Sequence, residues 1–110
     1  MSSMSALRPY TLNPAGGVGA AIVAAKTDTV LPNDASGVQA STVLVTVSIA
    51  TYVRVIAAGG TSVTSSNGIV VTPESGGVVL NTRGYKASAE LSHMRVGSSD
   101  GRICIIALEM

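Results

Sequence analysis

The longest regular pattern in this 110-residue chain is an alternation of apolar and mixed positions from residue 41 to residue 57. From residue 43 onward the odd positions are almost all apolar, while the even positions mix polar and apolar residues. A period of two residues is the signature of a β-strand with one buried face. One unbroken strand would be about 55 Å long, far beyond the usual length of a few residues. We therefore expect a bend or tight turn around residues 48–51 that divides the run into two strands.

Short apolar runs continue through the second half of the chain, separated by residues that favour turns. The dipeptides Asn67-Gly68 and Asp100-Gly101 each stand between two such runs. Both dipeptides are typical of type I′ turns, whose two central residues need a positive φ, so we predict a β-hairpin at each. Strands that recur about every 8 to 12 residues predict an all-β protein, either a small antiparallel β-sandwich or a jelly-roll-like domain. The expected strands include 61–64, 69–72, 78–82, 93–96 and 102–109.

The first 40 residues lack this regularity. Pro9, Pro14 and Gly16-Gly17 prevent a long regular element near the start. Residues 19–31 are rich in alanine but end in β-branched residues, so helix and strand both remain open, and we favour an extended conformation. We therefore divide the chain into an extended N-terminal arm over residues 1–40 and a β-sandwich body over residues 41–110. An arm of this kind is expected to contact neighbouring subunits.

The strand expected near the end of the chain is apolar on both faces, because Ile103 and Ile105 alternate with Cys104 and Ile106. An antiparallel sheet with one solvated face should alternate instead. Charged residues make up only 12% of the chain, against about 25% in an average domain. Both features predict a homo-oligomer, or contact with several subunits, because interface cores are poor in charge. The interface candidates are Ile103, Ile105, Ile106, Leu108, Tyr10 and Leu12.

The residue types that carry chemistry are few. His93 is the one histidine, and it has too few potential ligands nearby for a metal site, so we predict a histidine on a strand surface. Cys104 is the one cysteine and is interpreted as a small apolar residue within a strand. The six carboxylates form no close pair in the sequence that would suit general acid–base catalysis. We expect a non-enzymatic protein with no catalytic, cofactor-binding or metal-binding residue.

Charge and hydropathy also limit the partners. A net charge of +1 with scattered arginines gives no basic surface for nucleic acid. The longest apolar candidate, residues 18–25, ends at Lys26 and falls far short of the ~20 residues of a membrane-spanning helix. The first residues contain no apolar core of a secretion signal, and a single cysteine allows no internal disulfide. These features fit synthesis and folding in a reducing cytoplasm.

The stretches "ATYVRVIAAGGTSVTSSNGIVVTPESGGVVLNT" and "GSSDGRICIIALEM" carry a resemblance. They combine a strand with a "YVR" element, a Gly/Ser/Thr-rich hairpin, an apolar strand, a "PESG" turn and a closing strand. In this pattern, over about residues 50–110, the chain resembles small bacteriophage virion proteins of the head decoration or cement type. The resemblance implies a β-sandwich domain in the virion, made in the host cytoplasm, that binds the major capsid protein or other virion proteins.

Two other functions remain open. The first is a collar or tail component of the same kind of particle, which the resemblance also covers. The second, from a different class, is a carbohydrate-binding or adhesion module. Sugar sites usually contain an aromatic platform, so this function would need Tyr52 or Tyr85 exposed in a groove.

Overall fold

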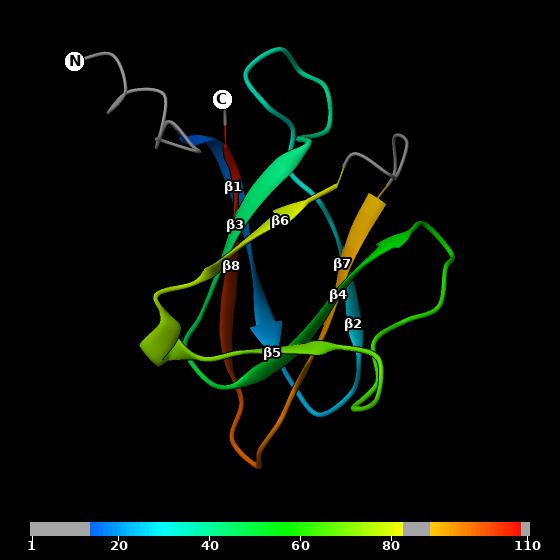
Figure 1. The fold of residues 1–110 in the computed structure, drawn as a ribbon, viewed down its shortest axis with the longest axis vertical. Helices are drawn as coiled ribbons and strands as arrows, with labels where there is room; N and C mark the ends of the chain where they lie inside the picture. The colour runs from blue at the N-terminus through cyan, green and yellow to red at the C-terminus, as the bar shows by residue number, and fades with distance from the viewer. Residues whose placement is uncertain (1–13, 83–88, 109–110) are drawn as a thin grey trace, which may run out of the picture.

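The computed structural model describes residues 14–82 and 89–108, and over these residues the chain is all-β (Figure 1). It forms eight strands and one short 3-10 turn. The prediction of an all-β fold is confirmed. The elements are β1 (Pro14–Ile22), β2 (Thr27–Val30), β3 (Thr42–Val47), β4 (Thr51–Ala57), β5 (Ile69–Val71), η1 (Pro73–Ser75), β6 (Val78–Asn81), β7 (Ala89–Arg95) and β8 (Gly101–Leu108).

The strands form two antiparallel sheets of four, packed against each other (Figure 1). The strand orders are β1-β8-β3-β6 in the first sheet and β2-β7-β4-β5 in the second. Strands pair from the outside of the chain inward: β1 with β8, β2 with β7, β3 with β6 and β4 with β5. Further pairing of β3 with β8 and of β4 with β7 joins this long double ribbon into the two sheets. An antiparallel ribbon rolled in this way is a jelly roll, so the topology agrees with the jelly-roll-like alternative.

The long alternating run divides where the sequence predicts. β3 ends at Val47 and β4 begins at Thr51, and the intervening residues carry the chain from the first sheet to the second. Ser48 fixes the crossing, because its amide donates to the carbonyl of Arg102 at 2.9 Å and its hydroxyl accepts from the Arg102 amide at 2.8 Å. The hydroxyl of Thr51 donates to the carbonyl of Ile49 at 2.7 Å. These hydrogen bonds satisfy the polar groups at the point where the chain changes sheet.

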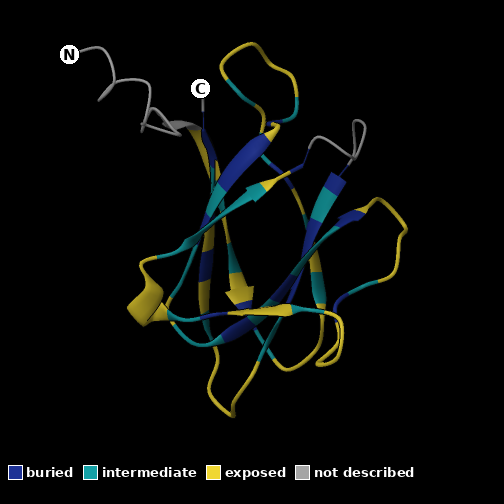
Figure 2. Ribbon diagram, in the orientation of Figure 1, coloured by how far each residue is buried: buried dark blue, intermediate teal, exposed yellow. Residues whose placement is uncertain are grey.

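The core between the sheets is aliphatic. Its buried apolar side chains, over the residues that are described, are all Val, Ile, Leu and Ala, and most of them belong to β3, β4, β7 and β8 (Figure 2). From Val43 to Val55 the odd positions of the alternating run are buried or packed against the core, as the period of two requires. The central side chains are Ile22, Leu31, Val43, Val45, Val53, Leu91, Ile103 and Ile105.

The boundary expected at residue 40 is wrong. β1 pairs along β8 and β2 pairs along β7, so both belong to the sandwich. Ile22 and Leu31 are 0% and 2% exposed and form part of the core. The extended conformation favoured for residues 19–31 agrees with β1 and β2. The remainder of the proposed arm, residues 1–13, lies outside the described residues.

Neither expected hairpin turn is present. The connection from β4 to β5 spans residues 58–68, and the connection from β7 to β8 joins strands of different sheets. Gly68 and Gly101 are not among the glycines with a positive φ. The side chain of Asn67 instead accepts a hydrogen bond from the amide of Thr64 at 2.7 Å, closing a local turn. The expected strand at 61–64 is also wrong, since Val63 lies buried within this loop and its amide donates to Ser92 at 2.9 Å.

Candidate functional site

The outer face of the first sheet is an apolar surface assembled from all four of its strands. Strand register places Gly17, Ile106, Leu44 and Val79 in one row across β1, β8, β3 and β6. The next row contains Gly19, Cys104 and Thr46, and a third contains Ala21 and Arg102. All of these residues are exposed or half-buried, because they alternate with residues that enter the core. We call this set the outer apolar face: Gly17, Gly19, Ala21, Leu44, Thr46, Val79, Arg102, Cys104 and Ile106.

Charge distinguishes this face from the outer face of the second sheet. Of the residues that form the outer apolar face, Arg102 alone is charged. The second sheet instead presents Asp28, Arg54 and Glu90 in the outward positions of β2, β4 and β7. A sheet face that is partly exposed and carries a single charge is inexpensive to desolvate, which is a property of surfaces that bind other proteins.

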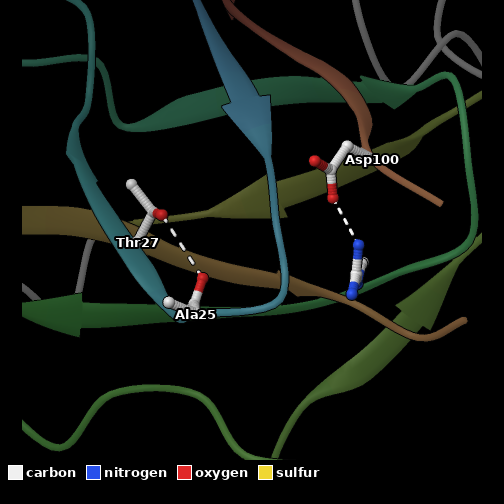
Figure 3. A network of polar contacts seen from close by, with 4 residues as sticks. Ala25, Thr27 and Asp100 are labelled. Carbon is white, nitrogen blue, oxygen red and sulfur yellow. Dashed lines mark hydrogen bonds and ion pairs between the residues drawn. The ribbon is translucent and has the colours of Figure 1, made fainter. Parts of the chain in front are cut away.

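A depression of about 430 Å³ lies on the outer apolar face. The guanidinium of Arg102 lies close above Gly19, since a Cβ at that glycine would be 3.3 Å from its Nη2 atom. The described residues provide this guanidinium with no carboxylate within ion-pair distance, whereas Arg95 pairs with Asp100 (Figure 3). Arg102 is therefore available to a carboxylate or carbonyl of a partner. The depression is lined by Gly19, Thr46, Val47, Ser48, Arg102, Ile103 and Cys104.

The outer face of the second sheet carries a polar network that holds the loop 58–68. Ser62 donates to Asp28 at 2.9 Å and accepts from Lys26 at 3.1 Å. Hydrogen bonding from Ser92 is the largest influence that lowers the pKa of Asp28, and Ser62 and Lys26 add to it while burial opposes them. Ser92 also accepts the amide of Val63. These contacts join the loop 58–68 to β2 and β7, so they hold the loop in place.

His93 is buried, so the expectation of a histidine on a strand surface is wrong. Register places it between Thr27 and Val53 on the inward face of the second sheet, where it is 0% exposed. Its Nε2 atom lies 2.9 Å from the hydroxyl of Thr29, and its buried Nδ1 atom has no hydrogen-bond partner among the residues that the structure describes. Burial lowers the pKa of His93, and the charge of Asp28 opposes this shift.

The contact between Thr29 and His93 joins a hydroxyl and an imidazole, as in a nucleophile and its base. A catalytic arrangement of this type needs a third group that orients the base. Among the described residues Nδ1 of His93 has no such partner, and the nearby carboxylate of Asp28 lies on the opposite face of β2. The described residues contain no group of three or more His, Cys, Asp or Glu side chains that could hold a metal ion. This pair is therefore best explained as a polar contact of the core.

Cys104 is exposed on the outer apolar face and lines the depression. The sequence places it correctly in an apolar strand, but its side chain points away from the core. Its neighbours across the sheet are Gly19 and Thr46. None of these neighbours is a base that could activate a thiol, so the position adds a small, weakly polar side chain to the face.

The structure separates the interface candidates. Ile103 and Ile105 are 1% and 0% exposed, and Leu108 is 4% exposed, so these side chains have almost no surface to offer a neighbouring chain. Ile106 is half-buried and lies on the outer apolar face, where an interface role stays a prediction. Tyr10 and Leu12 lie outside the described residues.

Sequence reasoning missed Leu44 and Val79, which stand beside Ile106 in the same row. An apolar residue at an even position of the alternating run was the available signal for Leu44. Tyr52 is half-buried on the second sheet, beside Val70, and does not line the depression. Tyr85 lies outside the described residues.

The fold and its surface define a small jelly-roll domain with one nearly uncharged sheet face. Comparison with models of protein families, with curated proteins and with solved structures gave no match to this chain. Within the described ranges, no helix has the length and apolar character needed to cross a membrane.

Proposed function

We propose that this chain is a non-enzymatic structural protein of a phage particle, of the capsid decoration or cement type. The observation that carries the proposal is the outer apolar face, on which Leu44, Ile106 and Val79 form a half-exposed row and Arg102 is the one charge. Burying such a row against a capsid subunit would contribute about 25 cal/mol for each Å² of apolar surface. The guanidinium of Arg102, which no carboxylate of the described residues pairs, would fix the orientation by binding a carbonyl or carboxylate of the shell.

The fold suits this role because it presents the row on a rigid sheet. Leu44 and Ile106 lie on β3 and β8, which are paired on both sides, and Val79 lies on the edge strand β6. The sheet holds these side chains in place before binding, so binding requires little further ordering. A protein that binds the assembled shell more tightly than free subunits stabilises the shell by mass action. Jelly rolls occur in viral capsid proteins, but also in lectins and cupins, so the fold supports the proposal only in combination with the face.

The test uses particles produced without this gene and purified protein added back. We expect the full chain to sediment with such particles. Ile106→Gln should weaken this binding by about tenfold or more, because it places an amide in the centre of the apolar row. Val70→Gln is the matched control, since Val70 is 53% exposed on the outer face of the second sheet and should bind as the unchanged chain does.

Several results would overturn the proposal. If mature particles that are produced with the gene present do not contain this chain, a virion role is excluded. Equal binding by the Ile106 and Val70 variants would exclude the outer apolar face as the contact. Electron microscopy of labelled protein separates a shell site from a collar or tail site. Binding to immobilised glycans rather than to particles would favour the adhesion function.

A further inference from the structure

Four strands lie at the edges of the two sheets, and β1 differs from the other three. β1 has nine residues, while β2 and β6 have four each and β5 has three. Short edge strands and charged edge residues are two ways in which proteins prevent unwanted pairing of sheets. β2 is short and contains Asp28, whereas β1 is long and has no charged residue.

β1 is paired on one side only. Its residues from Gly16 to Ile22 match Ala107 to Gly101 of β8 in regular antiparallel register. The backbone hydrogen bonds outside the ladders involve no residue of β1 among the described parts of the chain. The other side of β1 therefore presents a regular row of amide and carbonyl groups over seven residues, which is a template for a further strand.

The side chains of β1 also favour a further strand. Val18 and Ala20 point toward the core but remain half-buried, because none of the described strands covers them from the open side. A neighbouring antiparallel strand would cover both residues and extend the core along the edge. When a strand pairs with its own copy in antiparallel orientation, a charge near the twofold axis would lie close to the same charge of the copy, and a charge further out would still have to be covered by the added strand. β1 contains none.

We propose that β1 is a dimerisation edge, at which two copies of this chain pair β1 with β1 in antiparallel orientation. The two first sheets then form one sheet of the order β6-β3-β8-β1-β1-β8-β3-β6, with a twofold axis between the two β1 strands. The register of the two β1 strands must place the core-facing residues of both copies on the same side of the joined sheet. A slip of one residue would expose Val18 and Ala20. This inference extends the proposed function, since it doubles the outer apolar face into one continuous surface that reaches two capsid subunits.

The test measures the mass of the purified full chain by analytical ultracentrifugation, without particles. We expect a dimer. Ala21→Lys should weaken dimerisation by about tenfold or more, because it adds a charge to the exposed outward side of β1. Val30→Lys is the matched control on β2, where Val30 is 59% exposed, and should leave the dimer unchanged. Circular dichroism establishes that both variants keep the β fold.

Hydrogen exchange locates the contact. The amides of residues 16–22 that point away from β8 should exchange more slowly as the concentration of protein rises, while those of β2 and β5 should not change. A wild-type chain that stays monomeric at its highest soluble concentration would overturn the proposal. So would a dimer that Val30→Lys disrupts and Ala21→Lys does not. Protection of β1 that appears only on particles would show that another protein supplies the strand. A monomer that still binds particles through Ile106 would overturn the β1 pairing and leave the proposed function intact.

Discussion

Ile105 and Ile106 are neighbours in β8, and exchanging each for alanine should have opposite consequences. Ile105 is 0% exposed and lies between Val18 and Val45 on the two adjacent strands. Ile105→Ala removes buried carbon atoms and leaves a cavity, which costs about 2–5 kcal/mol. Because domains of this size are stable by only about 5–15 kcal/mol, this is a large share of the total. Ile106 is half-buried on the outer face, so Ile106→Ala should cost less than about 1.5 kcal/mol.

Urea unfolding followed by far-ultraviolet circular dichroism measures this difference. With a slope of about 2 kcal/mol per molar urea, Ile105→Ala should lower the midpoint by about 1 to 2.5 M, and Ile106→Ala by less than about 0.75 M. In particle binding Ile106→Ala should have the larger effect, because the folded Ile105→Ala variant keeps the outer apolar face and the Ile106→Ala variant does not. Equal losses of stability would show that the outer face is covered within the chain. An undiminished affinity of Ile106→Ala for particles would refute its role in docking.

Three further predictions concern the pH dependence of stability and the backbone conformation of a glycine. The stability due to neutral, buried His93 is fully present above its ordinary pKa of 6.5 and is lost as the pH falls below it, by at most about 1.4 kcal/mol per pH unit. Urea midpoints measured on both sides of that value should differ in the wild type and differ less in His93→Leu. The lowered pKa of Asp28 adds stability that is present above 3.8 and declines at lower pH, so Asp28→Asn should flatten the acid limb of the same titration. Gly77→Ala should destabilise the fold by about 1–3 kcal/mol, since φ is 113° and a Cβ would lie 2.8 Å from a carbonyl oxygen. Thermal melts should show almost no effect of Gly97→Ala, where a Cβ meets nothing within 4 Å.

The all-β class and the division near residue 48 could be predicted because both depend on a period of two residues. β1 could not be recognised in the same way, because its outward positions are Gly17, Gly19 and Ala21. Glycine and alanine give no contrast between faces, so the strand has no visible alternation. The expected hairpins failed because Asn-Gly and Asp-Gly indicate a local turn but do not determine which strands the turn connects.

The site depends on register, which no local pattern contains. Leu44, Val79 and Ile106 are far apart in the sequence and form one row only because β3 lies between β6 and β8. Burial of His93 and Ser92 on opposite faces of β7 has the same origin, since the core covers one and the loop 58–68 holds the other. A strand with buried residues on both faces must be covered on its second face by something outside its own sheet. For β7, the loop 58–68 of the same chain supplies part of this cover.

The rolled ribbon also determines when the molecule can fold during synthesis. Among the described strands β1 pairs only with β8, and β8 is the strand that separates β1 from β3. A nascent chain that has reached residue 100 has made seven of the eight strands but lacks the centre of its first sheet. Folds dominated by such distant pairings form slowly, in about milliseconds to seconds. Until β8 emerges from the ribosome, the uncharged edge of β1 has no partner in its own chain, so neighbouring nascent chains compete for it.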